Sequence, residues 1–153
     1  MPLSSDARQW AIQNFFFLNQ SVGDIGQWTL HICDGLTTSS DPSVANVTAA
    51  SKGTATVGDA TSGTSSPNRL QDFWEWNSSV DANNDGTTGG VRNKSSIAIT
   101  ATGAGTIDTF AIIMRDADDT DYVWAYGDTG TSVSLASGDG ISFSIGAIEF
   151  EIA

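Results

Sequence analysis

The stretch TIDTFAIIMRDADDTDYVWAYGDTGTSVSLASGDGISFSIGAIEFEIA, residues 106–153, is the densest run of strand-like sequence in the chain. Between Thr109 and Met114, one alternating set of residues is strongly apolar and the other set is nearly so. A strand that is apolar on both faces lies centrally in its sheet or between two layers. We therefore expect a β-rich fold organised around this strand.

The residues that follow predict a hairpin. The polar loop 116–121 turns the chain, and Tyr122–Tyr126 then alternates aromatic residues with Val and Ala, as in a return strand. We expect Gly127–Gly130 to end this strand before a short run, Ser132–Ala136, and Gly138–Gly140 to form the next turn.

The last strand contains a change of parity. Its apolar side chains occupy odd positions up to Ile145 and even positions from Ile148 onward. A period of two cannot change parity unless the strand bulges or bends. Gly146 lies at the change, and glycine is the residue that tolerates such a corner.

The bulk composition favours one small all-β domain. The chain has 153 residues, of which 39% are hydrophobic and only 16% charged, with 16 glycines. Its net charge is −12, from 18 acids against 6 bases. Phosphate contacts and anionic lipid surfaces both require Lys and Arg, so we expect neither nucleic acid nor a membrane as partner. Nothing near Met1 resembles a secretory signal, and we expect assembly in a cytoplasm.

Residues 1–25 are predicted to form an N-terminal helix or arm, and residues 26–153 a single β-sandwich domain that is jelly-roll-like. Asp6 and Gln9 resemble a capping box, and apolar residues recur at helical spacing over Ala7–Leu18. The aromatic residues of this segment are Trp10, Phe15, Phe16 and Phe17. Because they cannot all face one side, the helix either packs on its own sheet or docks partly on another chain.

The middle of the chain is less regular. Trp28–Ile32 predicts a strand with one apolar face, and His31 and Cys33 are predicted to be structural. Gly35–Pro67 is rich in Ser, Thr, Gly, Ala and Asp, so we expect long loops with at most a weak strand near Ser51–Val57.

Two tryptophans on one strand face, Trp74 and Trp76, admit two interpretations. They fill the core or a subunit interface, or they form a sugar-stacking platform as in a carbohydrate-binding module. Together with the N-terminal aromatics they complete the set of predicted interface residues, which is Trp10, Phe15, Phe16, Phe17, Trp74 and Trp76.

Residues 81–86, DANNDG, match the first half of a calcium loop. The twelfth position requires a bidentate acid but holds Arg92, so we expect no metal and no dependence of stability on calcium. The acidic loop with Asp116, Asp118, Asp119 and Asp121 is a second, equally unspecific candidate for a cation site, and the competing interpretation is a solvated turn between strands. No nucleophile–base pair, phosphate loop or zinc spacing occurs, and we expect no catalytic residue and no cofactor.

The C-terminal third resembles small structural proteins of tailed bacteriophages. The matching pieces, in order, are Ile112–Ala117, Tyr122–Tyr126, Leu135–Asp139 and Gly146–Ile152. Such proteins are described either as capsid decoration (cement) proteins or as tail components. We favour a decoration protein on the virion surface, bound to the major capsid protein and to copies of itself, and the resemblance implies a homotrimer. A tail or head–tail component on the same fold is the alternative that it leaves open.

Overall fold

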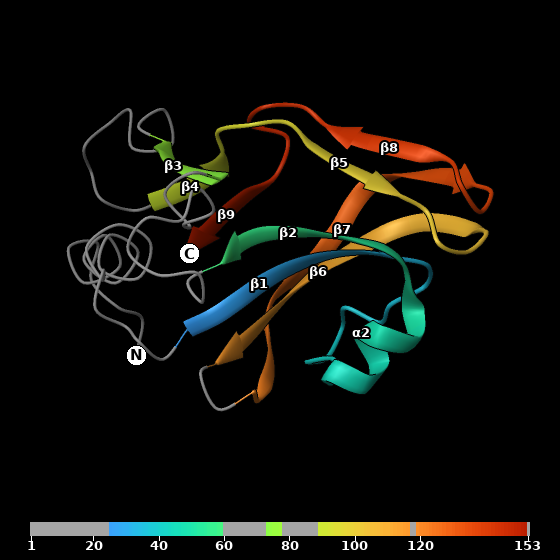
Figure 1. The fold of residues 1–153 in the computed structure, drawn as a ribbon, viewed down its shortest axis with the longest axis horizontal. Coiled ribbons are helices and arrows are strands. Elements are labelled where there is room, and N and C mark those ends of the chain that lie inside the picture. Colours follow the sequence, from blue (N-terminus) through green and yellow to red (C-terminus); the bar gives the residue numbers. More distant parts are fainter. Residues whose placement is uncertain (1–24, 60–72, 78–88, 117–118, 153) are drawn as a thin grey trace.

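The computed structural model describes residues 25–59, 73–77, 89–116 and 119–152 (Figure 1). These residues are mostly strand, in antiparallel sheets with one short helix, which confirms the predicted all-β, sandwich-like class. The predicted N-terminal helix over Ala7–Leu18 lies outside the described residues.

The described elements follow one another in a simple order. They are β1 (Ile25–Cys33), α2 (Val44–Ala50), β2 (Ser51–Asp59), β3 (Trp74–Asn77), β4 (Gly89–Asn93), β5 (Ile97–Thr100), β6 (Gly105–Asp116), β7 (Asp121–Leu135), β8 (Gly140–Phe143) and β9 (Glu149–Ile152).

The largest sheet has the strand order β2-β1-β6-β7, with antiparallel neighbours throughout. β6 lies between β1 and β7 and is buried on both faces, with Ile112 on one side and Ala111 and Ile113 on the other. The prediction of a central strand is confirmed. Both alternating sets are apolar because each face of β6 is covered by a separate cluster of side chains.

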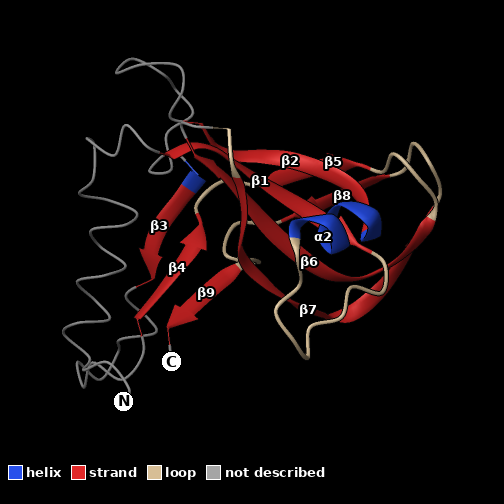
Figure 2. Ribbon diagram, turned by 90° about the horizontal axis from the view of Figure 1, so that it is seen from below, coloured by secondary structure: helices blue, strands red, loops and turns tan. Residues whose placement is uncertain are grey.

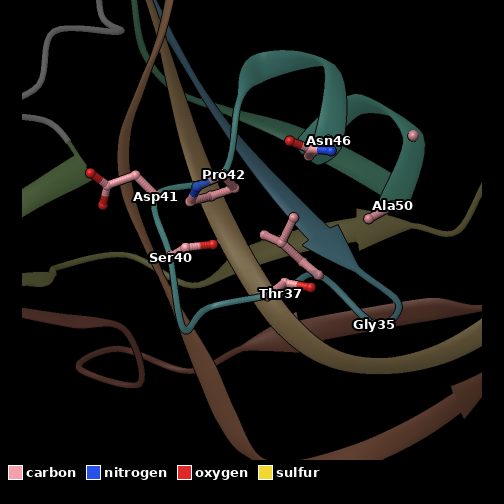
Figure 3. A pocket seen from close by; sticks show the side chains of 9 residues that line it. Gly35, Thr37, Ser40, Asp41, Pro42, Asn46 and Ala50 are labelled. Carbon is pink, nitrogen blue, oxygen red and sulfur yellow. The ribbon is translucent and has the colours of Figure 1, made fainter.

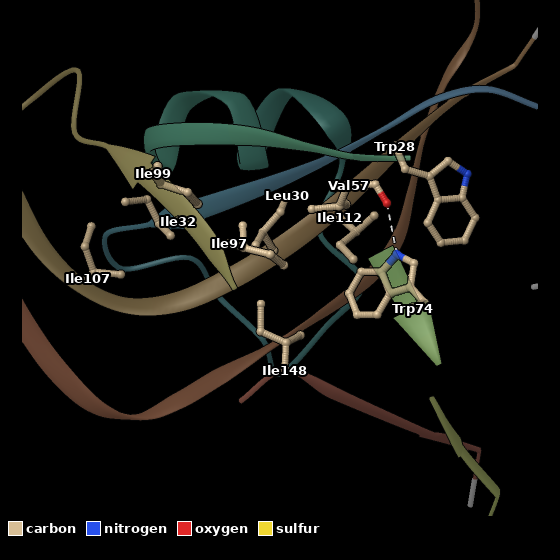
Figure 4. Packing of buried hydrophobic residues seen from close by; sticks show 10 residues of the cluster. All are labelled: Trp28, Leu30, Ile32, Val57, Trp74, Ile97, Ile99, Ile107, Ile112 and Ile148. Atoms are coloured by element: carbon tan, nitrogen blue, oxygen red, sulfur yellow. Dashed lines mark hydrogen bonds between the residues drawn. The ribbon is translucent and has the colours of Figure 1, made fainter. Parts of the chain in front are cut away.

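The main core lies between this sheet and a second layer (Figures 1 and 4). That layer consists of the pair β5-β8 and the three-stranded sheet β3-β4-β9. The buried residues of the core are Trp28, Leu30, Ile32, Val57, Trp74, Ile97, Ile99, Ile107, Ile112 and Ile148. A jelly roll has two four-stranded sheets; here the second layer is divided into sheets of three and two described strands.

The opposite face of the large sheet is covered by α2 (Figure 2). This helix corrects our expectation that residues 35–67 are loop with a weak strand, and that helix is confined to the first twenty or so residues. Ser43 and Asn46 form a capping box, with the Ser43 Oγ accepting from the Asn46 N–H at 3.2 Å. The helix has 7 residues; it fully buries Val47, and Val44 and Ala50 pack beside it at a spacing of three, an apolar stripe of only two turns. β2 is likewise a full strand of 9 residues.

β7 runs on through Gly127–Gly130, where we predicted that a strand would end. Thr109 pairs with Asp128 and Ile107 pairs with Val133, so residues 129–132 oppose Asp108 alone. Gly130 has a φ of 72° within this excursion. The predicted break is therefore a bulge, which lengthens the strand instead of ending it.

A second bulge in β7 reverses the expected alternation of its aromatic residues. Ile112 pairs with Ala125 and Ile113 with Val123, which leaves Trp124 as the extra residue. Trp124 contacts the main core, with its ring centroid 4.5 Å from that of Trp28, whereas Tyr126 packs on the α2 side. The expectation that the aromatics of Tyr122–Tyr126 share one face is wrong, because each bulge shifts the parity by one.

The corner predicted at Gly146 is confirmed. β8 pairs with β5 and β9 pairs with β4, so the chain changes sheets between them. Gly146 has a φ of 74°, Ile145 is 63% exposed and Ile148 is 3% exposed. The change of parity in the sequence therefore marks the point at which the chain leaves one sheet for another.

Candidate functional site

The structure places one of the six predicted interface residues firmly inside the fold. Trp74 is 0% exposed and its indole N–H donates to the carbonyl of Val57 at 3.0 Å (Figure 4). That burial removes Trp74 from the interface set and from any sugar-stacking platform, since a ring needs an open face to stack. Trp76 belongs to β3, and its side chain lies outside the described residues. Trp10, Phe15, Phe16 and Phe17 also lie outside them.

The loop between β1 and α2, residues 34–43, is the most extensively anchored loop that we find. Its Gly35 N–H donates to Asp108 Oδ1 at 2.9 Å, and its Thr38 hydroxyl donates to Asp128 Oδ1 at 3.1 Å. The Tyr126 hydroxyl donates to Asp41 Oδ1 at 2.6 Å. Strands β6 and β7 thus hold this loop through the carboxylates of Asp108 and Asp128 and through the hydroxyl of Tyr126.

A hollow of about 490 Å³ lies between this loop and α2 (Figure 3). Thr37, Ser40, Asp41 and Asn46 contribute its polar groups, and Leu36 and Pro42 its apolar ones. A second hollow of about 340 Å³ shares Leu36 and is lined by Asp108, Asp128 and hydroxyl residues of the β7 bulge. Among the described lining residues there is no His, Cys or Lys, so the hollows offer hydrogen-bonding oxygens without a nucleophile–base pair.

Asp41, Asp108 and Asp128 already accept hydrogen bonds within the fold. Asp41 raises the pKa of Tyr126, because the phenol donates its hydrogen bond to that carboxylate and because ionisation beside it would bring two negative charges together. Sequence reasoning missed these anchoring residues. Aspartates next to Gly or Thr are ordinary turn residues, and only the fold brings loop and strand together.

Arg92, which stands where the calcium loop requires an acid, and Asp121 of the acidic loop are both engaged in ion pairs. Arg92 donates to Glu75 at 2.7 Å, and Arg115 contacts both carboxylate oxygens of Asp121, at 2.8 and 3.0 Å. Throughout the described part of the chain, no three His, Cys, Asp or Glu side chains gather as a cation site. The half calcium loop at residues 81–86 lies outside that part.

His31 and Cys33, the two residues with the most reactive side chains, are both half to fully buried. Burial lowers the pKa of His31, an effect that the negative charge of Asp121 partly opposes, and His31 Nδ1 lies 3.0 Å from Ser51 Oγ. Burial, with a smaller contribution from Asp108, raises the pKa of the Cys33 thiol to about 12. A neutral imidazole and a protonated, buried thiol fit the structural roles that we predicted for them.

β7 lies at the edge of the large sheet. None of its 15 residues is fully buried. Tyr122 and Val133 are 48% and 42% exposed, and Ile145 near the Gly146 corner is also exposed. Among the described strands β7 pairs with β6 alone. Long edge strands of this kind are surfaces on which another chain can pair.

Comparison with known proteins finds no matching family model, no matching curated protein and no matching solved structure. Within the described residues, no helix has both the length and the apolar character to cross a bilayer.

Proposed function

We propose that this chain is a non-enzymatic structural protein of a tailed-bacteriophage virion, which binds the outside of the assembled capsid and reinforces it. The observation that carries the proposal is β7, an edge strand of 15 residues with no fully buried residue. A long edge strand with no fully buried residue is suited to contact a neighbouring chain.

The resemblance in the C-terminal third supports the same proposal. Within the described residues, Ile112–Asp116 and Tyr122–Tyr126 belong to the β6–β7 hairpin, Leu135–Asp139 to the following turn, and Gly146–Ile152 to the corner and β9. These are residues that set the shape of a surface, as expected of a protein that acts by binding.

The proposed mechanism is burial of apolar and aromatic surface across neighbouring capsomers, repeated over many symmetry-related copies. Each Å² of apolar surface removed from water contributes roughly 25 cal/mol, although area alone does not fix affinity. The protein would act as a homotrimer and contact the major capsid protein.

Copy number per virion tests the proposal. Quantitative mass spectrometry of purified virions should find hundreds of copies, and purified protein added to undecorated capsids should bind and raise the temperature at which they open. A few copies per virion would instead indicate the tail or head–tail alternative.

The oligomeric part needs its own measurement. Sedimentation at low and high salt should show a trimer that holds or strengthens with salt, because copies of net charge −12 repel one another at low ionic strength. Deletion of Met1–Asn19 should weaken capsid binding. A monomer at every salt concentration, whose deletion variant still decorates capsids fully, would refute the trimer and the role of the N-terminal segment.

The carbohydrate-binding alternative has lost its best support, since Trp74 is buried. A glycan array separates it from the proposed function, and specific binding to one glycan class would favour it.

A further inference from the structure

We propose that the outer edge of β7 accepts an extended, cationic segment of a partner chain as an added β-strand. This inference rests on the proposed function, because it names the kind of segment through which a capsid would hold the protein.

The two edges of the large sheet differ. At the β2 edge the carbonyl of Lys52 already accepts a hydrogen bond from the Thr102 N–H at 2.7 Å, and Lys52 adds a positive charge that discourages pairing. At the β7 edge no described strand pairs with the side turned away from β6. The sequence of β7 contains no Lys, Arg or Pro, the residues that commonly protect an edge.

The two bulges limit the accepting stretch. One lies at Trp124 and the other at residues 129–132, so Ala125–Asp128 is the regular segment between them. Tyr126 and Asp128 pair with Ala111 and Thr109, which alternate on one strand, so both side chains lie on the α2 side of the sheet. Two carboxylates therefore lie beside this segment. One belongs to Asp128, and the other to Asp41, which accepts a hydrogen bond from the Tyr126 hydroxyl.

Charge identifies the occupant. Residues 105–153 contain nine acids and a single base, Arg115, and Asp121 already pairs with that base. The loop and helix over residues 34–50 add Asp34 and Asp41 without any base. A second copy of this chain would bring its own acids to the edge, whereas a cationic strand would neutralise the existing ones.

The spacing of residues between neighbouring strands also predicts a sequence pattern for the added strand. Side chains opposite one another on neighbouring strands have Cβ atoms about 5 Å apart, and alternate residues share a face. Lys or Arg at positions i and i+2 of the added strand would therefore face Tyr126–Asp41 and Asp128 together. The intervening position would face the other side of the sheet, where the Phe110 ring packs over Gly127.

The test uses the intact protein and a short synthetic peptide in which lysine alternates with valine, with a glutamate–valine peptide of equal length as the negative probe. The lysine peptide should bind, bind less at high salt, and protect the amides of β7 from hydrogen exchange. Asp128→Asn, which keeps an acceptor for Thr38, should weaken binding about three- to fivefold. Asp119→Asn is the matched control, because Asp119 is exposed and its φ of 60° suits Asn.

Three results would overturn the proposal. They are an absence of β7 protection by the lysine peptide, equal weakening by both Asn variants, and β7 protection in the concentrated protein alone, which would identify a second copy as the occupant. Tyr126→Phe is a second variant for the same test. It removes the hydroxyl but leaves the Asp41 charge in place, so it should preserve lysine-peptide binding. The peptide assay needs no capsid, so its outcome is independent of the copy number that tests the proposed function.

Discussion

Ile148 and the buried residue Asn93 are joined by hydrogen bonds in both directions, one through the Asn93 side chain and one through its main chain. The Ile148 N–H donates to Asn93 Oδ1 at 2.9 Å, and the Ile148 carbonyl accepts from the Asn93 N–H at 3.2 Å. The Asn93 amide nitrogen also donates to the carbonyls of Ser95 and Ser144, at 2.9 and 2.8 Å. One side chain therefore fixes the corner between β8 and β9.

We expect Asn93→Ala to lower the free energy of unfolding by about 2 to 4 kcal/mol, because it leaves the buried Ile148 N–H without its acceptor and two carbonyls without their donor. Urea unfolding measures this loss. Asn46→Ala is the matched control, since Asn46 is an exposed member of the α2 capping box and its loss should cost about 1 kcal/mol or less. Equal losses in both variants would contradict a special role for Asn93.

Gly146→Ala should destabilise the protein by about 1 to 2 kcal/mol, because its φ of 74° forces a side chain into the left-handed region. Gly146→Asn should cost less, since Asn tolerates that region, and Gly146→Val should cost more. Gly140→Ala serves as the comparison, because an added Cβ there meets nothing within 4 Å. Thermal melts of the four variants should show this ranking, and a Gly140 variant as unstable as Gly146→Ala would speak against it.

Cys33 should resist thiol reagents in the folded protein. Its pKa of about 12 leaves very little thiolate at pH 8, and its side chain is 0% exposed. Ellman's reagent should therefore label the native protein only as fast as it unfolds, and should label one thiol per chain at once in strong denaturant. Rapid stoichiometric labelling under native conditions would show that the thiol is accessible.

His31 should make the protein less stable as the pH falls below about 6.5. Its pKa is lowered by burial in the folded state, so the unfolded chain binds this proton more readily and stability rises with pH through this range. His31→Gln should flatten that part of the curve of stability against pH. The loss of stability at more acidic pH should remain in this variant. The hydrogen bond from Arg115 lowers the pKa of Asp121, so the stability that Asp121 contributes is lost only near and below the ordinary carboxyl pKa. A slope in the His31→Gln variant equal to that of the original protein would refute the assignment.

Several strands could be predicted because apolar and polar residues alternate along them, and this alternation shows which face is buried. Trp28–Ile32 and Ile97–Thr100 each show one buried face in the sequence and in the structure, and the strand through Ile112 shows two. The corner at Gly146 was predictable for the same reason, since a change of parity has few backbone solutions. α2 was not predicted, because its apolar residues Val44, Val47 and Ala50 span only two turns and so short a periodic pattern does not stand out in the sequence.

The sequence by itself determined that this chain is a β protein with a central, doubly buried strand and an acidic surface, because alternation and charge are properties of neighbouring residues. Only the tertiary structure decided that Trp74 is part of the core, that Tyr126 faces α2, and that Asp41, Asp108 and Asp128 hold one loop. These relationships depend on bulges and on pairings between distant segments. A bulge shifts every following side chain to the other face, and no local pattern records which distant strand will receive it.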